Sequence, residues 1–274
     1  MLSLIKIEWL KIKRYPAFWW MLVIVALTYP GVNAIAYYGY LEATKGKEMT
    51  NNIARFLLGN PFAFPEAWHT VAWLSSFFIL IPSILVIMMV TNEYTFRTHR
   101  QNIIDGWSRK QFITSKLADV LIISVIVSFV YILVAIIYGA IADSSSFFQW
   151  NLQLQYIGLF LLQTFAQLSL AFLLGYLVKK AFIALGIFMF YYVVIENIAV
   201  GYSRFKLNDI GRFLPFEISD RILPAPAFFS RWGKDAKASY DHALSLIPEH
   251  IVYTILLTSI VWVICYAVHK KRDL

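Results

Sequence analysis

The sequence is short of cysteine and of charge, and each shortage excludes a class of protein. A single cysteine, Cys265, occurs among 274 residues, which excludes a disulfide framework and a cysteine-based metal cluster. Only 15% of the residues are charged and 59% are hydrophobic, whereas an ordinary soluble domain has roughly 25% charged residues. So few charges could not cover the surface of a protein in water. We therefore expect an integral membrane protein.

Motifs for direct nucleotide, metal or acyl-transfer chemistry are also lacking. Gly46-Lys47 is followed by Glu48, so the chain has no glycine-rich loop of the kind that cradles ATP phosphates. No pair of histidines or carboxylates has the helical spacing of metal ligands, and no metal site is predicted. The stretch Gly201–Arg204 lacks the second glycine of a nucleophile elbow. No catalytic residue and no directly bound cofactor are predicted, and an intramembrane enzyme is the least favoured function.

What the sequence does contain is long apolar runs. Runs of about 20 residues predict membrane-spanning α-helices, since the strands of a membrane barrel would alternate. The six predicted spans are residues 16–38, 70–90, 117–142, 154–178, 181–202 and 251–268. Pro82 is expected to bend the second span. Two pairs of small residues, Ala135/Gly139 and Ala171/Gly175, permit close helix approach.

The segments outside the spans predict further helices, and we treat residues 1–274 as one all-α transmembrane domain. Residues 1–15 mix lysine and arginine with apolar residues, which predicts an amphipathic helix lying in the membrane interface. Residues 203–248 form a long segment before the last span, and a segment of that length usually has structure or function of its own. Its apolar stretches Phe213–Phe216 and Ala225–Phe229 are expected to re-enter the membrane as short helices.

The excess of basic residues predicts an orientation. The formal net charge is +8, and in a membrane protein such an excess is typical of loops that face the anionic cytoplasmic leaflet. The short basic loops lie on the side of the two termini. We expect a multi-pass membrane protein, in contact with lipid, with both termini cytoplasmic and no nucleic-acid partner.

A polar, basic segment, residues 92–116, separates the second and third spans; we call it the coupling segment. Its middle predicts a short amphipathic helix. Asp105-Gly106-Trp107-Ser108 then predicts a turn, because glycine tolerates a positive φ and Asp and Ser bond their own backbone. A second helix is expected to start near Ser108.

The architecture and two stretches of the coupling segment resemble the ABC-2 type permease family. Asn92–Thr98 resembles the family's glutamate followed by a glycine-threonine step, although Arg97 stands where many members have glycine. Asp105–Phe112 resembles its turn-Ser-Arg stretch, which leads to a lysine, here Lys116, at the next span. Within the family, the sequence is most similar to bacitracin-resistance and lantibiotic-immunity permeases.

This resemblance implies the membrane subunit of an ATP-driven exporter of amphipathic or small molecules, located in a bacterial inner membrane. The coupling segment would be a cytoplasmic coupling helix that docks onto a separate ABC ATPase subunit, which binds ATP and Mg. A second permease copy, or a related permease, would complete the complex. The residues expected to couple to the ATPase are Glu93, Phe96, Arg97, Arg100, Ile103, Ile104, Trp107 and Arg109.

Polar residues inside the predicted spans are candidates for a translocation path. Gln163 and Gln167 share one face of the fourth span, and Glu196 lies beside Asn197 in the fifth. An ionisable group at that depth is costly and suggests a function. Hydrogen bonding to another helix, or for Glu196 a hydrated place near the end of the span, is the more ordinary explanation of such residues. The main alternative function is a secondary transporter or channel that uses Glu196.

Overall fold

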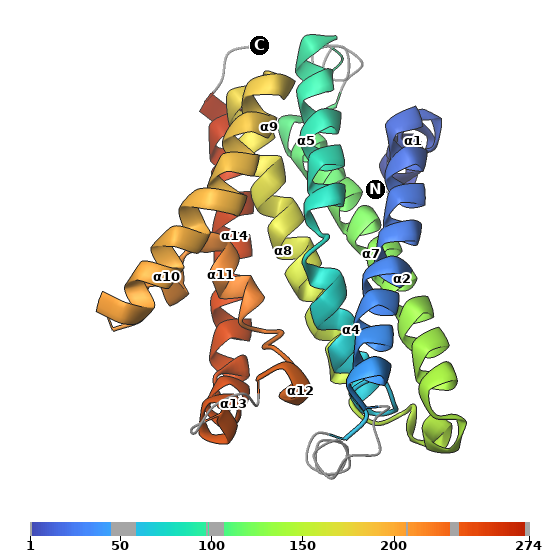
Figure 1. Ribbon diagram of the computed structural model, residues 1–274. Coiled ribbons are helices and arrows are strands. Elements are labelled where there is room, and N and C mark those ends of the chain that lie inside the picture. The colour runs from blue at the N-terminus through green and yellow to red at the C-terminus, as the bar shows by residue number, and fades with distance from the viewer. Residues whose placement is uncertain are drawn as a thin grey trace.

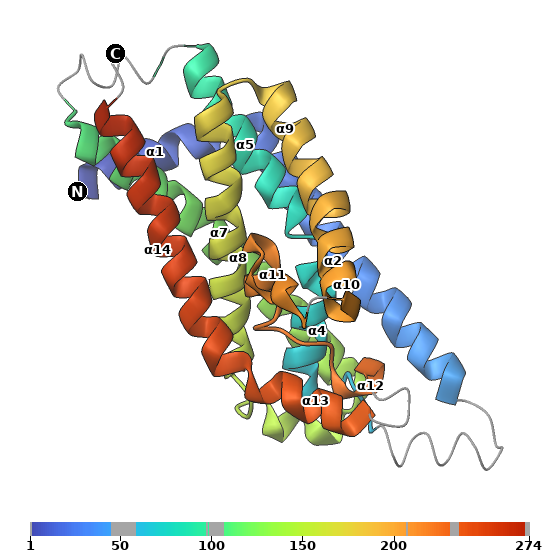
Figure 2. The ribbon, with the colours of Figure 1, turned by 90° about the vertical axis from the view of Figure 1, so that its left-hand side faces the viewer.

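The fold is a bundle of long helices. The computed structural model describes residues 2–44, 59–96, 98, 107–206, 208–230 and 236–271, and within these ranges every regular element is helical. Both termini lie toward the same end of the bundle (Figures 1 and 2). We call this the terminal end and the opposite one the distal end.

Within the described ranges, five helices are long and apolar enough to cross a membrane. They are α2 (Pro16–Thr44), α7 (Arg109–Ala142), α8 (Gln155–Val178), the continuous stretch Ala181–Arg204 and α14 (Ile247–Lys271). The stretch Ala181–Arg204 comprises α9 (Ala181–Phe190), the π-turn η2 (Tyr191–Ile195) and most of α10 (Glu196–Lys206). These helices confirm a multi-pass, all-helical membrane protein.

Two shorter helices that follow one another form a sixth span if together they count as one crossing. Helices α4 (Glu66–Ser76) and α5 (Leu80–Thr95) meet at an angle of 50°. The break lies one turn before Pro82, because the proline ring clashes with the carbonyl four residues earlier and has no N–H to donate. The bend predicted for this span is therefore present.

Helix α8 lies at the centre of the bundle. It packs against α4, α5, α7, α9, α11 and α14, and it runs between α5 and α14 in Figure 1. Gly175 permits its close approach to α5: a Cβ built there would lie 2.5 Å from Val90 Cγ1 and 3.3 Å from Ile87 Cα. The Cβ of a residue at Gly139 would overlap the Phe64 ring. Both small residues thus serve contacts within this chain.

Replacing Gly175 with alanine is expected to destabilise the protein by about 1–3 kcal/mol, because the added methyl overpacks the contact between α8 and α5. The matched control is Gly186→Ala on α9, where a Cβ would meet nothing within 4 Å. That control should be neutral or stabilising, since alanine favours a helix over glycine by about 1 kcal/mol. Unfolding in mixed micelles, followed by tryptophan fluorescence, measures both, and equal effects would contradict the packing.

At the terminal end, α1 (Leu2–Arg14) precedes the first span and packs on α7. It ends just before Pro16, as expected for a residue followed by proline. Its helical form agrees with the amphipathic helix predicted for residues 1–15, while its location in the membrane interface stays a prediction. The middle of the coupling segment, including Arg97, Arg100, Ile103 and Ile104, lies outside the described residues.

The segment before α14 contains several short helices. They are η3 (Ile210–Phe213), α11 (Pro215–Asp220), α12 (Ala227–Ser230) and α13 (Ala236–Ser245), and η1 (Ser144–Gln149) lies between α7 and α8. Helix α11 packs against α8 and α14. Helices α11 and α12 overlap the apolar stretches Phe213–Phe216 and Ala225–Phe229 that the sequence singled out. Their re-entry into the membrane stays a prediction.

Candidate functional site

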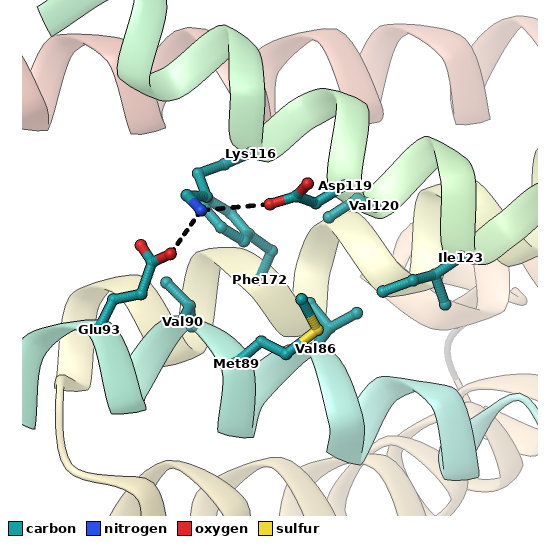
Figure 3. Close-up of a pocket in the computed structure, with 9 residues that line it drawn as sticks. All are labelled: Val86, Met89, Val90, Glu93, Lys116, Asp119, Val120, Ile123 and Phe172. Carbon is teal, nitrogen blue, oxygen red and sulfur yellow. Dashed lines mark hydrogen bonds and ion pairs between the residues drawn. The ribbon is translucent and has the colours of Figure 1, made fainter. Parts of the chain in front are cut away.

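A buried cluster of charged side chains joins three helices at the terminal end. The Lys116 ammonium lies 2.7 Å from Glu8 Oε2, 2.5 Å from Glu93 Oε1 and 3.2 Å from Asp119 Oδ2. Figure 3 shows Lys116 of α7 pointing between Asp119 and Glu93. Glu8 comes from α1 and Glu93 from the last turn of α5. We call these four residues the Lys116 cluster.

Local sequence places each member of the cluster. Helix α7 starts where the turn residues predicted it, because Ser108 and Gln111 form a capping box at its N-terminus. The helix then runs without a break, so that Lys116 and Asp119, three residues apart, share one face. On α1, Glu8 is the acidic residue of an otherwise basic, apolar helix, and it is 1% exposed.

The floor beneath the cluster is apolar and closely packed. Val86, Met89, Val90, Val120, Ile123 and Phe172 line it (Figure 3). The cavity among these side chains measures about 20 Å³, which is room for roughly one water molecule. A substrate does not fit there. The Lys116 cluster can therefore fix helices relative to one another, but it cannot hold a cargo.

Removing the Lys116 ammonium, which all three carboxylates share, would be costly. An ion removed from water loses several kcal/mol of solvation, and a buried charge that loses its partner destabilises a protein by about 3–5 kcal/mol. Lys116 thus ties α1, the end of α5 and the start of α7 into one unit. The chain enters the coupling segment from α5 and leaves it through α7, so the cluster spans the base of that segment.

The pKa of the Glu8 carboxyl shows how strongly the neighbouring lysines stabilise its ionised form. Burial by itself raises its pKa, but the Lys116 ammonium, helped by Lys11 at 2.9 Å, outweighs burial and lowers the pKa from 4.5 to about 2. A depressed carboxyl pKa stabilises the folded state by about 3 kcal/mol when the group is ionised. The contribution is complete above about pH 4.5, and it is lost as the pH falls toward 2.

We therefore expect the stability advantage of the wild type over Glu8→Gln to shrink as the pH is lowered from about 5 to about 2. The glutamine keeps the shape of the side chain and titrates no proton, so the difference between the two proteins isolates Glu8. Thermal unfolding at a series of pH values measures it. A difference that stays constant across this range would show that Lys116 does not hold the Glu8 carboxylate in the folded protein.

Three further residues of the coupling segment, Phe96, Trp107 and Arg109, have different surroundings. The Phe96 side chain is 73% exposed. The Trp107 ring lies under the Lys11 ammonium of α1, at 5.3 Å, which is a cation–π distance. Arg109 donates to the backbone carbonyl of Lys270 at the end of α14, where a basic side chain compensates unpaired carbonyls. The structure thus leaves Phe96 accessible and uses Arg109 to hold α14.

The predicted path residues converge on the short helix α11. Gln163 and Gln167 of α8 both donate to Asp220 Oδ1, at 2.8 and 2.6 Å. Glu196 Oε1 accepts from the backbone N–H groups of Phe216 and Glu217, at 2.8 and 2.7 Å. These contacts secure the two ends of α11.

Asn197 does not join this group. Its amide donates to the backbone carbonyls of Tyr192 and Val193, within its own helical stretch. Among the described residues, no group of three or more His, Cys, Asp or Glu side chains could hold a metal ion.

Sequence reasoning missed three members of these sites. Glu8 stands alone as an acid in the basic stretch 1–15, and this was a usable signal. Asp119 lies inside the predicted span 117–142, so the rule that singled out Glu196 should also have singled out Asp119. Asp220 carries no comparable local signal, because only the fold brings it to Gln163 and Gln167.

Comparison with known proteins identifies the family. A sequence model of the family described as ABC-2 family transporter protein matches residues 4–195. The chain belongs to the ABC-2 transporter family. The matched stretch begins in α1 and ends at Ile195, so it contains all of the Lys116 cluster. A search of curated proteins finds no match.

Family membership agrees with the architecture. A multi-pass helical membrane protein of the ABC-2 family is a transport protein, and membership indicates a permease subunit rather than an enzyme. The family generally works with an ATPase partner and often as a permease pair. The match does not separate the bacitracin-resistance-like subtype from other members, and that subtype stays a prediction.

Proposed function

We propose that this chain is the permease subunit of an ATP-driven exporter. It would move an amphipathic or small-molecule substrate out of the cytoplasm, driven by a separate ABC ATPase subunit that binds ATP and Mg. The complex would lie in a bacterial inner membrane with both termini cytoplasmic, and a second permease, identical or related, would complete it. Family membership supports a permease subunit, and the geometry of the terminal end supports the coupling.

The observation that carries the proposal is the position of the Lys116 cluster at the base of the coupling segment. Glu93 precedes that segment's middle and Lys116 follows it, and the two are ion-paired. A force applied to residues between them reaches α5 and α7 through both the chain and this pair. Because Lys116 also holds Glu8, α1 would move with them.

Such a unit fits alternating access by rigid-body motion. Closure of the ATPase subunits around ATP would push the coupling segment, and α5 and α7 would tilt against α8. Away from the Lys116 cluster, α11 is bonded to α8 through Asp220 and to α10 through Glu196. We propose that α11 re-enters the membrane and lines the path, so that movement of α8 reaches the substrate.

The surface offered to the ATPase would combine exposed apolar side chains with basic ones. Phe96 is 73% exposed, and α1, at the same end of the bundle, exposes Ile7, Trp9 and Leu10. Aromatic anchors with a polar or basic rim are typical of protein interfaces. Part of the α1 face would instead lie against lipid headgroups, as expected for an interfacial helix.

The alternative based on Glu196 finds less support. A proton carrier needs a carboxyl that exchanges its proton during transport, whereas Glu196 is 4% exposed and accepts two backbone hydrogen bonds at the start of α11. These two bonds tie the carboxyl group to the start of α11. The geometry therefore favours a positioning role for Glu196 within the exporter.

Affinity purification of the tagged chain from native membranes tests the proposal. The expected result is a co-purifying ATP-binding protein, which is lost when the coupling segment is disrupted by Phe96→Asp. Phe148→Asp provides the control, since Phe148 is an equally exposed phenylalanine in η1, at the opposite end of α7. Recovery of the chain without any ATP-hydrolysing companion would contradict the proposal.

A further inference from the structure

The distal end contains a large cavity that the coupling machinery does not use. Its volume is about 580 Å³, within the range of small-molecule sites. Its walls come from α4, the start of α8, α12, α13 and the residues just before α4. These elements lie together at the distal end in Figure 2.

The charged group in the cavity wall is negative. Among the described lining residues, Glu66 is the only one with a formal charge, and no lysine or arginine accompanies it. One carboxylate oxygen, Oε1, accepts from Gln153 Nε2 at 3.0 Å. No hydrogen bond to the second oxygen occurs in the part of the chain that the structure describes. An anionic ligand would meet this carboxylate without compensation, whereas a cation would be attracted to it.

Two oxygen atoms enclosed within the wall also lack hydrogen-bond partners in the described part of the chain. Gln153 Oε1 and Thr70 Oγ1 are buried without a hydrogen-bond partner among the described residues, and the Thr70 side chain is fully buried. Leaving a buried acceptor unpaired costs free energy. Because both atoms are closed off from the cavity, the acceptor that the cavity offers to a ligand is the Glu66 carboxylate. An ammonium group, with three N–H donors and no acceptor, matches such a carboxylate.

Most of the remaining wall is apolar or aromatic, and two of its aromatic rings are held in place by neighbouring side chains. Tyr156 stacks on His69 with ring centroids 4.2 Å apart, and His69 in turn bonds the carbonyl of Pro224. Phe228 packs edge-on against Tyr40 at 5.3 Å. Aromatic faces attract both apolar groups and cations. The cavity therefore offers an acidic side and an apolar side to the same ligand.

We propose that this cavity binds a cationic amphiphile, with an ammonium group at Glu66 and an apolar body against Tyr156 and Phe228. The role of that ligand as the transported substrate rests on the proposed function, but its binding does not. The ammonium belongs either to a free amine or to the headgroup of phosphatidylethanolamine. Both sources present the same chemistry to Glu66.

The test uses the full chain in nanodiscs of phosphatidylcholine, without any ATPase. The probe is dansylcadaverine, which has one ammonium and a fluorescent apolar ring system, and its N-acetyl derivative lacks the charge. We expect the ammonium probe to bind at least about tenfold more tightly than the neutral one, as a charged hydrogen bond contributes roughly that much. Equal binding of the two probes would overturn the proposal.

Three variants sharpen the test. Glu66→Gln removes the charge and keeps an oxygen for Gln153, so it should abolish the preference for the ammonium probe. Glu249→Gln removes a carboxylate from the first turn of α14, outside the cavity, and should leave binding unchanged. Gln155→Glu adds a carboxylate to the wall and should tighten binding. If Glu66→Gln binds like the wild type, Glu66 only stabilises the start of α4 and the proposal is wrong.

Adding phosphatidylethanolamine to the nanodiscs identifies the source of the ammonium. Competition with the probe that disappears in Glu66→Gln assigns the site to a lipid headgroup. Undiminished probe binding assigns it to a free amine. Because no ATP is present, failure of this binding would leave the exporter proposal standing, and failure of ATP-driven transport would leave the binding result standing.

Discussion

Replacing Lys116 with methionine is expected to destabilise the protein by about 3–5 kcal/mol. The substitution conserves most of the side-chain volume and removes the ammonium. It leaves the carboxyl groups of Glu8, Glu93 and Asp119 around an apolar side chain. Their mutual repulsion and lost solvation, rather than a cavity, would cause the loss. We expect α1 to detach first, because Glu8 is its buried polar anchor.

Unfolding in mixed micelles, followed by tryptophan fluorescence, measures this effect against Lys110→Met. Lys110 is an exposed lysine on the same helix, so its replacement should change stability by no more than about 0.5 kcal/mol. Adding Glu8→Gln and Glu93→Gln to Lys116→Met should recover part of the loss, because fewer uncompensated carboxyl groups remain. Equal stabilities for the Lys110 and Lys116 variants would show that the cluster contributes nothing.

Glu93→Gln is expected to separate ATP hydrolysis from transport. Lys116 keeps Glu8 and Asp119 as partners in this variant, so the fold should survive. The ion pair between the end of α5 and the start of α7 is lost, and a push on the coupling segment would then move the two helices less in concert. We expect transport per ATP hydrolysed to fall by about tenfold, which corresponds to roughly 1.4 kcal/mol of lost coupling.

Reconstituted complexes allow both rates to be measured in the same vesicles. Glu42→Gln is the control, because Glu42 is an exposed glutamate near the end of α2. Its ratio of transport to hydrolysis should equal that of the wild type. If Glu93→Gln lowers both rates in proportion, the pair only supports folding or assembly and does not transmit force.

The sequence predicted the features that depend on local pattern. The apolar runs predicted the long helices, because a backbone in lipid must satisfy its own hydrogen bonds. The turn before Ser108 predicted the start of α7, and Pro82 predicted a bend in the second span. The coupling-segment motifs led to the right family. Each of these signals lies within a few residues of the feature it predicts.

The pairings within the sites could not be predicted in the same way. Glu8 and Lys116 are far apart in the chain, as are Gln167 and Asp220, and periodicity gives a helix face without saying which helix it meets. The pairs of small residues illustrate this limit. Gly139 and Gly175 permit close approach as expected, but their partners, Phe64 and the backbone of α5, follow only from the fold.

The contact between Glu196 and α11 shows why the role of a site residue cannot be assigned before its neighbours in the fold are known. Glu196 attracted attention as an intramembrane acid, and the structure uses its carboxylate to accept from the first N–H groups of α11. Acceptors at a helix N-terminus satisfy donors that have no partner inside the helix. An acid at this depth can thus support the start of a short helix.

ATP-stimulated transport by the double variant Trp107→Ala/Ile103→Ala tests the central claim most directly. The claim is that another polypeptide drives the coupling segment, and these two residues are its predicted apolar contacts; Ile103 lies outside the described residues. The wild type and the double variant would be reconstituted with the co-purified ATPase in matched vesicles. The account predicts at least a tenfold loss of ATP-stimulated transport. Equal transport by the two proteins would contradict it.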